Sequence, residues 1–266
     1  MSKPLVSVIM GVYNEEQTLG KCIDSILSQT YDNWEFIICD DGSTDGTIDI
    51  LERYQSEDSR IKVLKNKENI RLAASLNRCL NVSEGKYIAR MDADDISVPE
   101  RFERQVNFLE THKDVDCVGS NMMVFDESGD KGSRNSIENP SMDNLLTRTP
   151  FFHPTIMMRK SVYQKLGGYT VSDATMRAED LDLWFRFYKE GYKGYNIQEN
   201  LYKYHESKTD YKKRTINAAI KTAKVYLYGY RLLGFSKTKY WHAGKPIVSA
   251  FIPNAIMERY HKSKLM

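Results

Sequence analysis

The sequence predicts an α/β fold, in which a mostly parallel sheet carries helices on both faces and a helical tail follows. Short apolar runs of strand length alternate with amphipathic segments of helix length through the first hundred residues, which is typical of a parallel sheet with right-handed crossovers. Polar, mostly acidic segments follow the ends of three of these runs. The composition, 41% hydrophobic and 28% charged, is that of a globular protein, so a packed core is expected.

The expected strands are short, mainly apolar segments, and the first is a continuous apolar run that suits the buried middle of a parallel sheet. They cover residues 5–10, 34–39, 60–65, 86–91 and 115–125, with a short one at 156–159. The expected helices place apolar residues at helical spacing. They cover residues 15–29, 45–55, 72–80, 99–109 and 160–166, and one more begins within 177–184. Residues 126–143 are rich in Gly, Ser and Asn and are expected to form a polar loop.

The charge distribution divides the chain into a domain at 1–210 and a basic tail at 211–266. From residue 200 onward there are 14 Lys or Arg against 3 Asp or Glu, a net of +11, and the preceding residues carry −9. The tail also contains an expected amphipathic helix at 215–233. Its apolar face comprises Ile216, Ile220, Ala223, Leu227 and Tyr230. A basic amphipathic tail suits an anionic membrane surface, or its helices pack on the body or on a second subunit.

Several classes of protein are disfavoured by what the sequence lacks. We expect no signal peptide, because residues 5–10 already form a strand, and no membrane span, because the apolar run at 247–257 is too short. Neither G-x-G-x-x-G nor a P-loop motif follows the first strand, which argues against a dehydrogenase or a P-loop enzyme. The four cysteines lack metal or redox spacing, so we expect reduced, packed thiols in a cytoplasmic protein. They are Cys22, Cys39, Cys79 and Cys117.

An acidic tetrad, Asp92-Ala93-Asp94-Asp95, directly follows the expected strand at 86–91. Three carboxylates in so short a stretch repel one another unless a cation lies among them. Mg²⁺ and Mn²⁺ prefer oxygen ligands, and Mg²⁺ often joins one or two carboxylates to substrate phosphates. The tetrad therefore predicts a metal–diphosphate site, and the alternative is a solvated acidic turn.

Two other segments are candidates for the same site. The turn from Gly11 to Asn14 and the pair Asp40-Asp41 follow the first two strands, and ligands of open α/β sheets bind at that edge. Further along, Glu179 and Asp180 open a helix. Acidic residues in a first helical turn are favoured by the helix dipole, so these two either serve the helix alone or supply a catalytic carboxylate.

Taken together and in order, these stretches resemble the family 2 glycosyltransferases, which have the GT-A fold. The resemblance covers about residues 5–210. Its motifs are V6-S-V-I-M-G-V-Y-N-E15, D40-D-G-S-T-D-G-T47, A73-A-S-L-N77, A89-R-M-D-A-D-D95 with P99-E-R101, H153-P-T155 and E179-D-L-D-L-W184. Each is short and unspecific alone, and their order and spacing make the match specific.

The resemblance implies a donor site on the first strands. Asp40 and Asp41 would contact the base and ribose of a nucleoside diphosphate sugar. The backbone of Gly11, Val12 and Tyr13 would flank the uracil. The first acids of the tetrad, Asp92 and Asp94, match the D-x-D motif of the family. One acid of the tetrad would touch an Mn²⁺ or Mg²⁺ ion, and the others would hold ribose and bound water.

The resemblance also implies the remaining site residues. Asp94 or Asp95 would touch the metal, with His205 as a late metal or phosphate contact. Asp180 matches the general base, with Glu179 beside it, and His153 matches a pocket histidine. One position departs from the family: Arg71 stands where glycine is usual, so the loop beside the donor is expected to differ in shape.

The expected function is an inverting, metal-dependent transfer of a sugar from a UDP-sugar to an acceptor hydroxyl. The acceptor would be a saccharide, by analogy a lipid-linked one, in the synthesis of a surface polysaccharide. No nucleic acid partner is expected, and association with the inner face of the cell membrane or with a second copy of the chain stays open. The alternatives are a nucleotidyltransferase, which would want basic residues in its first loop, and a catalytically inactive protein that binds nucleotide sugars.

Overall fold

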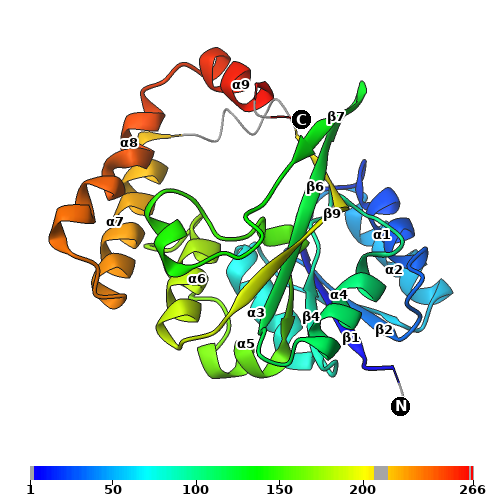
Figure 1. Ribbon diagram of the computed structural model, residues 1–266. Helices are drawn as coiled ribbons and strands as arrows, with labels where there is room; N and C mark the ends of the chain where they lie inside the picture. The colour runs from blue at the N-terminus through cyan, green and yellow to red at the C-terminus, as the bar shows by residue number, and fades with distance from the viewer. Residues whose placement is uncertain (1–2, 207–214, 264, 266) are drawn as a thin grey trace.

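A computed structural model describes residues 3–206, 215–263 and 265. It contains a nine-stranded sheet with the order β3-β2-β1-β4-β8-β6-β9-β5, and β7 pairs with β6 outside this path. Helices α1, α2 and α4 cover one face of the sheet, and α3, α5 and α6 cover the other (Figure 1). The predicted α/β architecture with helices on both faces is confirmed.

The first half of the chain is the parallel half of the sheet. Its strands are β1 (Val6–Val12), β2 (Trp34–Asp40), β3 (Ile61–Lys65) and β4 (Tyr87–Arg90), paired in parallel. The linking helices are α1 (Leu19–Leu27), α2 (Thr47–Glu57) and α3 (Leu72–Val82). Helix α1 begins four residues later than predicted, because Glu15 to Thr18 form a turn whose Glu15 amide donates to Thr47 Oγ1.

The second half completes a mixed sheet. Its strands are β5 (Ile96–Ser97), β6 (Cys117–Asp126), β7 (Gly129–Arg134), β8 (Met157–Arg159) and β9 (Gly194–His205). Strand β8 is antiparallel to both β4 and β6, while β9 runs parallel to β6. Helices α4 (Arg101–Thr111), α5 (Lys160–Leu166) and α6 (Glu179–Lys189), with 3₁₀ turns η1 (Met142–Leu146) and η2 (His153–Thr155), complete this half.

The prediction of a polar loop over residues 126–143 is wrong over residues 129–134, where β7 forms a hairpin with β6. The sequence of β7, Gly-Asp-Lys-Gly-Ser-Arg, has no apolar alternation because the strand is largely exposed. Its pairing comes from β6 and from a turn at Gly129, whose φ of +111° a residue with a Cβ rarely adopts. Strands β5 and β9 were not predicted either, because their sequences show no continuous apolar run or clear alternation of apolar and polar residues.

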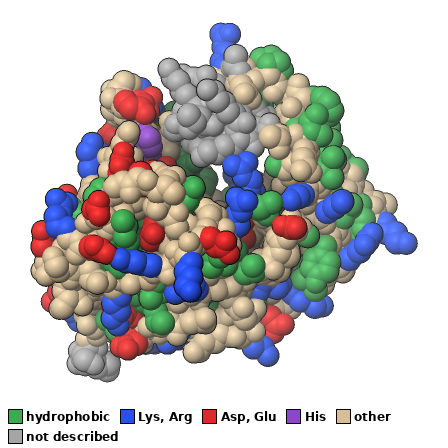
Figure 2. Space-filling view, turned by 180° about the vertical axis from the view of Figure 1, so that it is seen from behind, with side chains coloured by type: hydrophobic (Ala, Val, Ile, Leu, Met, Phe, Trp, Pro, Cys, Tyr) green, Lys and Arg blue, Asp and Glu red, His purple; other side chains and the backbone are tan. Residues whose placement is uncertain are grey.

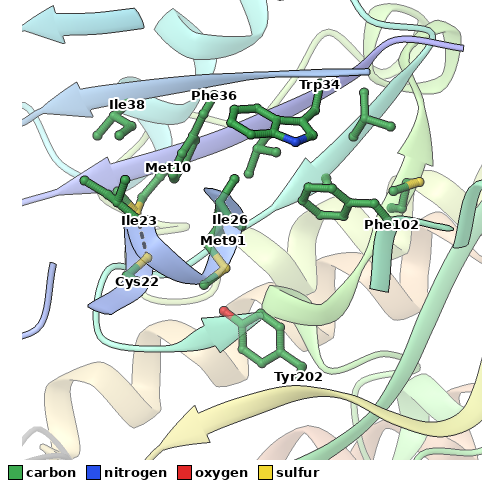
Figure 3. Close-up of a cluster of buried hydrophobic side chains, with 14 of the residues drawn as sticks. Met10, Cys22, Ile23, Ile26, Trp34, Phe36, Ile38, Met91, Phe102 and Tyr202 are labelled. Atoms are coloured by element: carbon green, nitrogen blue, oxygen red, sulfur yellow. Dashed lines mark hydrogen bonds between the residues drawn. The ribbon is translucent and has the colours of Figure 1, made fainter. Parts of the chain in front are cut away.

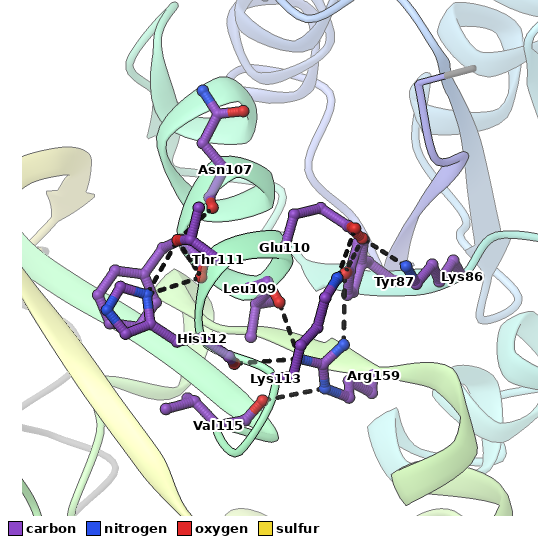
Figure 4. Close-up of polar contacts among 11 residues, drawn as sticks. Lys86, Tyr87, Asn107, Leu109, Glu110, Thr111, His112, Lys113, Val115 and Arg159 are labelled. Carbon is purple, nitrogen blue, oxygen red and sulfur yellow. Dashed lines mark hydrogen bonds and ion pairs between the residues drawn. The ribbon is translucent and has the colours of Figure 1, made fainter. Parts of the chain in front are cut away.

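A polar network ties β8 and α4 to the beginning of β4 (Figure 4). Glu110 of α4 accepts hydrogen bonds from Lys86, Tyr87 and Lys113, which together lower the pKa of its carboxyl to about 2. The guanidinium of Arg159 donates to the carbonyls of Leu109 and Val115. The network lies at the opposite end of β4 from the acidic tetrad, so its role is to hold the sheet together.

The loop before α6 is held by a motif residue. Asn77 of α3 donates through Nδ2 to the carbonyl of Tyr169 and accepts from its amide, both at 2.8 Å. Gly168, at φ +74°, leaves room for the Asn77 side chain, because a Cβ there would lie 2.5 Å from Asn77 Oδ1. The Asn77 motif therefore positions the segment that leads to Glu179 and Asp180.

The chain after residue 214 forms α7 (Ile216–Leu232), the 3₁₀ segment η4 (Lys237–Gly244), α8 (Lys245–Ala250) and α9 (Asn254–Lys262). Helix α7 packs on α6, as Figure 1 shows. A Cβ at Gly229 would lie 2.2 Å from the Phe185 ring, and Val225 and Tyr230 are buried in the same core. Ile216 and Ile220, by contrast, are exposed. The predicted boundary near residue 210 lies outside the described residues and stays a prediction.

The cysteines agree with the sequence analysis, since all four are free and buried. Among the helices that the structure describes, none combines the length and the apolar character that crossing a bilayer requires.

Candidate functional site

The acidic tetrad follows β4, and its Ala93 belongs to the apolar core that contains Met10, Cys22, Met91 and Tyr202. Figure 3 shows these four side chains. Cys22 donates its thiol to the carbonyl of Asp92 at 3.3 Å. Burial, with the nearby acids, raises the pKa of that thiol well above its usual range, so Cys22 is a packing residue here and not a nucleophile.

Two buried arginines offset the acids. Arg90 Nη2 lies 2.6 Å from Asp92 Oδ1. Arg101 Nη2 donates to the carbonyls of Arg90 at 2.8 Å and Pro154 at 3.1 Å. A buried cation persists only when it is paired or richly hydrogen-bonded, and both arginines meet that condition. Arg101 thereby joins the tetrad to the segment of His153, and two motifs that are separate in the sequence meet at one site.

Asp94 and His205 face each other across the site. His205 ends β9, and its Nδ1 lies 3.9 Å from Asp94 Oδ2. Burial, then the charges of Asp92 and Glu15, raises the pKa of Asp94 to about 6. The carboxyl is thus held where its own charge is unfavourable unless a cation lies beside it.

Asp95 is the most deeply buried acid of the tetrad, with 1% of its surface exposed. Its Oδ1 accepts the backbone amide of His205 at 2.7 Å, while Oδ2 has no partner among the described residues. Burial and the charges of Asp94 and Asp92 raise its pKa. Asp95 therefore positions the end of β9 beside Asp94.

The arrangement fits a divalent ion held by few protein ligands. A separation of 3.9 Å between Asp94 Oδ2 and His205 Nδ1 allows both atoms to bind one ion at ordinary distances of about 2.0–2.2 Å. The three acids do not act as one cluster, because Asp92 is paired with Arg90 and Asp95 with the His205 amide. Accordingly, no group of three or more metal-ligating side chains is found among the described residues.

Asp180 lies in the first turn of α6, as predicted. Its Oδ1 accepts the amide of Leu181 at 2.7 Å. Burial, followed by the charge of Glu179, raises its pKa to about 6, and the charge of Asp92 adds to the shift. The tertiary fold thus brings Asp180 within electrostatic reach of the tetrad, and its carboxylate is a stronger base than a solvated one.

His153 lies beside Asp180's helix, with its ring edge-on to Trp184 at 5.5 Å between centroids. Its Nε2 is 2.9 Å from the hydroxyl of Tyr169, and Nδ1 has no partner among the described residues. Burial and the charge of Arg90 lower its pKa to about 3. The imidazole is therefore neutral and suits a hydrogen bond better than proton abstraction.

The two acids after β2 have different surroundings. Asp41 accepts hydrogen bonds at 2.7–3.0 Å from Asn66, Ser75 and the amides of Ile70 and Arg71. Asp40 accepts one at 3.3 Å, from the amide of Ser43. Asp41 thus organises the loop that leads into α3, and the contact of either acid with a donor stays a prediction.

The turn after β1 leaves an aromatic face at the same edge. Gly11 packs against α3, where a Cβ would lie 3.0 Å from Leu72 Cδ1. Tyr13, two residues later, is 44% exposed. A partly exposed tyrosine ring can stack on a nucleobase, which agrees with the expected place of Gly11, Val12 and Tyr13 beside the uracil.

Sequence reasoning missed three residues of the site. Arg90 was visible as a lone charge within an apolar strand, a pattern that indicates a buried partner. Tyr169, which contacts His153, and Tyr202, whose hydroxyl accepts the amide of Asp92 at 3.2 Å, gave no local signal. Both become part of the site only through tertiary packing.

Comparison with known proteins agrees with this geometry. The model of glycosyl transferase family 2 matches residues 7–185. EpsE of Bacillus subtilis strain 168, whose name assigns it provisionally to the glycosyltransferases, is 50% identical over 266 residues, covering 100% of this chain and 96% of that protein. WfaP of Escherichia coli, named as a UDP-Glc:α-D-GlcNAc-diphosphoundecaprenol β-1,3-glucosyltransferase, is 32% identical over 203 residues, covering 76% of this chain and 78% of that protein.

Solved structures with the same fold include two of lower sequence identity. TarS 1-349 of S. aureus in complex with UDP has a TM-score of 0.66 at 20% identity and covers 96% of this chain and 77% of that one. The mannosyltransferase PcManGT of Pyrobaculum calidifontis, in complex with GDP-Man and Mn²⁺, has a TM-score of 0.66 at 18% identity and covers 98% and 80%. The family match favours a glycosyltransferase over a nucleotidyltransferase. The chain therefore belongs to the family 2 glycosyltransferases and has the GT-A fold.

Proposed function

We propose that this protein transfers a sugar from a UDP-sugar to a hydroxyl of a lipid-linked saccharide, with inversion at the anomeric carbon, in the synthesis of a surface polysaccharide. The observation that carries the proposal is the placement of Asp180, with its pKa raised to about 6, within electrostatic reach of the tetrad. An inverting transferase needs one base and a site that stabilises the leaving diphosphate, and Asp180 and the tetrad are the candidates for these two roles.

The reaction follows from that placement. The acceptor hydroxyl attacks the anomeric carbon as its proton passes to the Asp180 carboxylate. The new glycosidic bond forms on the face opposite the departing oxygen, whose bond to the sugar breaks and leaves UDP. A single displacement converts an α-linked donor into a β-linked product and requires no enzyme nucleophile.

The same site suits an Mn²⁺ or Mg²⁺ ion, with Asp94 and His205 as ligands and Asp95 holding His205 in place. When bound, such an ion neutralises the charge that develops on the departing diphosphate. Asp92, paired with Arg90, would serve as a contact for ribose or for bound water. The presence of Mn²⁺ with GDP-Man in the PcManGT structure supports the proposal.

The donor and acceptor classes rest on the relatives. WfaP is named for a UDP-glucose donor and a diphosphoundecaprenol-linked acceptor, and TarS has been solved with UDP-GlcNAc. A base contact from Asp40 and a stacking ring at Tyr13 suit uracil in this chain. The alternative, an inactive protein that binds nucleotide sugars, retains the same donor site and lacks only turnover.

A screen of UDP-sugars for hydrolysis, read by released UDP, tests the proposal. We expect one UDP-hexose or UDP-N-acetylhexosamine to release UDP faster than the others in the presence of Mn²⁺. GDP-mannose serves as the contrasting donor. Tight binding of a UDP-sugar without release of UDP, with and without saccharide acceptors, would support the inactive alternative.

We also propose that the tail docks on the anionic inner face of the cell membrane. The tail carries several exposed apolar residues. The most exposed are Trp241, Phe251 and Val248, with 73%, 70% and 66% of their surface accessible to solvent. Residues 215–266 contain nine Lys or Arg and one Glu. Figure 2 shows basic and apolar side chains interspersed along the edge of the molecule that α7 and α8 form. Aromatic rings amid cations suit a bilayer interface.

Binding to phosphatidylglycerol vesicles checks this surface. Replacing both Trp241 and Phe251 by serine should weaken binding about tenfold or more, since burying one large apolar side chain is worth about 1.5–3 kcal/mol. Val82→Ser, which removes an exposed apolar residue of α3, is the matched control. Removing the tail altogether is a poorer test, because α7 contributes Val225 and Tyr230 to the core. A concentration-dependent dimer that the double serine variant abolishes, without vesicle binding, would point to a second copy instead.

A further inference from the structure

A pocket of about 440 Å³ lies beside the candidate base, outside the set of residues expected to bind the donor. One wall is the turn that enters α3, with Ile70, Arg71 and Leu72. The other is the loop from Thr170 to Arg177, together with Glu179. None of the residues assigned above to the nucleotide lines it. Because Glu179 precedes Asp180 in α6, the pocket lies next to the candidate base.

The backbone of Arg71 is strained. Its φ of +78° and ψ of 158° fall in a region that is essentially reserved for glycine. The conformation is imposed by Asp41, whose carboxylate accepts the amides of Ile70 and Arg71, both at 2.9 Å. A glycine at this position would be free of the strain. The fold itself therefore gains nothing from an arginine at this position.

The side chain of Arg71 is available for a ligand. It is exposed, and within the part of the chain that the structure describes it forms no hydrogen bond or ion pair. It is also the only charged residue on its wall of the pocket. Arg177, a second exposed residue with positive φ, +66°, lies on the opposite wall together with Asp173 and Glu179.

The chemistry of this wall suits a phosphate beside an apolar chain. A guanidinium binds phosphate oxygens through paired hydrogen bonds. Ile70 and Leu72 flank Arg71 with 37% of each side chain exposed, and Val171 is exposed across the pocket. The carboxylates on the loop wall suit sugar hydroxyls, which accept and donate hydrogen bonds.

We propose that this pocket binds the diphosphate and the adjoining sugar of a lipid-linked acceptor, with Arg71 as the main phosphate contact. The inference rests on the proposed function and deepens it, because it names the feature by which the acceptor is recognised. It also gives a reason for an arginine where the fold favours glycine: the cation is kept for binding at the expense of stability.

Two substitutions separate the strain of Arg71 from its charge. Arg71→Gly removes both, and Arg71→Ala removes the charge but leaves the strain. We expect Arg71→Gly to raise Tm by about 2 °C or more, since relief of about 1 kcal/mol shifts Tm by about 2–4 °C in a chain of this size. Arg71→Ala should not raise Tm. Lys67→Ala, which removes an exposed cation of the same loop outside the pocket, is the matched control.

Transfer to two acceptors measures recognition of the phosphate. One carries the saccharide on an isoprenoid diphosphate, and the other carries it on a neutral alkyl chain. We expect both Arg71 variants to lower the preference for the diphosphate acceptor, measured as the ratio of kcat/KM values, by about tenfold or more, because a charge-assisted hydrogen bond is worth about 1.5–3 kcal/mol. Lys67→Ala should leave the ratio unchanged.

Direct binding keeps this inference separate from the proposed function. Farnesyl diphosphate, titrated by calorimetry, should bind the native protein and bind Arg71→Ala about tenfold more weakly, whether or not any UDP-sugar is turned over. Equal binding of farnesyl diphosphate to both proteins overturns the pocket assignment. A second result would also overturn it: the Arg71 variants lose affinity for the UDP-sugar while their preference between the two acceptors stays unchanged. Arg71 would then be assigned to the donor site.

Discussion

Replacing Asp180 with asparagine should lower the rate of sugar transfer by about 10²–10⁴-fold, the usual effect of losing a general base. The substitution keeps the size of the side chain and the hydrogen bond from the Leu181 amide, so the fold should be retained. UDP affinity should change little, because Asp180 belongs to the acceptor side of the proposed reaction. Initial rates of transfer, with UDP titrated separately, measure both quantities.

The pH dependence of the reaction tests the same carboxylate independently. Because burial and Glu179 raise the pKa of Asp180 to about 6, the base is protonated below that pH and ionised above it. Activity should therefore rise with pH through about 6. Glu179→Gln removes the charge that contributes to the shift, so the rise should move to lower pH with a much smaller loss of maximal rate.

Other outcomes would reassign the roles. If Asp180→Asn retains near-normal transfer and Glu179→Gln does not, Glu179 is the base. If both variants retain transfer, the base is neither residue. His153 is then the next to test, although its pKa, lowered to about 3 by burial and Arg90, makes it a weak base.

Replacing Asp94 with alanine should abolish the dependence of UDP binding on a divalent metal. We expect Mn²⁺ to tighten UDP binding to the native protein by about 10²-fold relative to EDTA, because neutralisation of phosphate charge by a bound ion is worth several kcal/mol. Without Asp94, His205 alone would hold the ion poorly. Calorimetric titrations of UDP with Mn²⁺ and with EDTA give the comparison.

Asp49→Ala is a suitable control, because it removes one exposed carboxylate of α2 away from the tetrad and should leave the effect of Mn²⁺ intact. His205→Ala should weaken the effect as Asp94→Ala does. Equal affinity of the native protein for UDP with Mn²⁺ and with EDTA would show that binding needs no metal. The tetrad would then be an acidic wall that Arg90 and Arg101 balance.

The sequence alone determined the parallel half of the fold and most of the candidate site. Strands β1, β2 and β4 are buried on both faces, so their sequences are mainly apolar, and the polar residues that follow them could be read directly. Asp180 could be placed in the first turn of α6 because helix periodicity is also local. These features depend on neighbours only a few residues away.

Tertiary structure decided how the acids divide their work. Asp92, Asp94 and Asp95 look alike in sequence. In the folded chain, the buried Arg90 pairs with Asp92. Strand β9 brings the backbone amide of His205 to Asp95 and the imidazole of His205 to Asp94. Strand β9 itself was not predicted, because its pairing partner β6 lies nearly 80 residues earlier in the chain.

The strain at Arg71 and the packing of α7 were likewise hidden from the sequence. A positive φ at Arg71 follows from the carboxylate of Asp41, 30 residues away, and the place of α7 follows from the fit of Gly229 against Phe185. Local patterns record which residues prefer strand, helix or water. Which buried group meets which partner is decided by long-range packing and by the electrostatics of burial, and these exist only once the chain has folded.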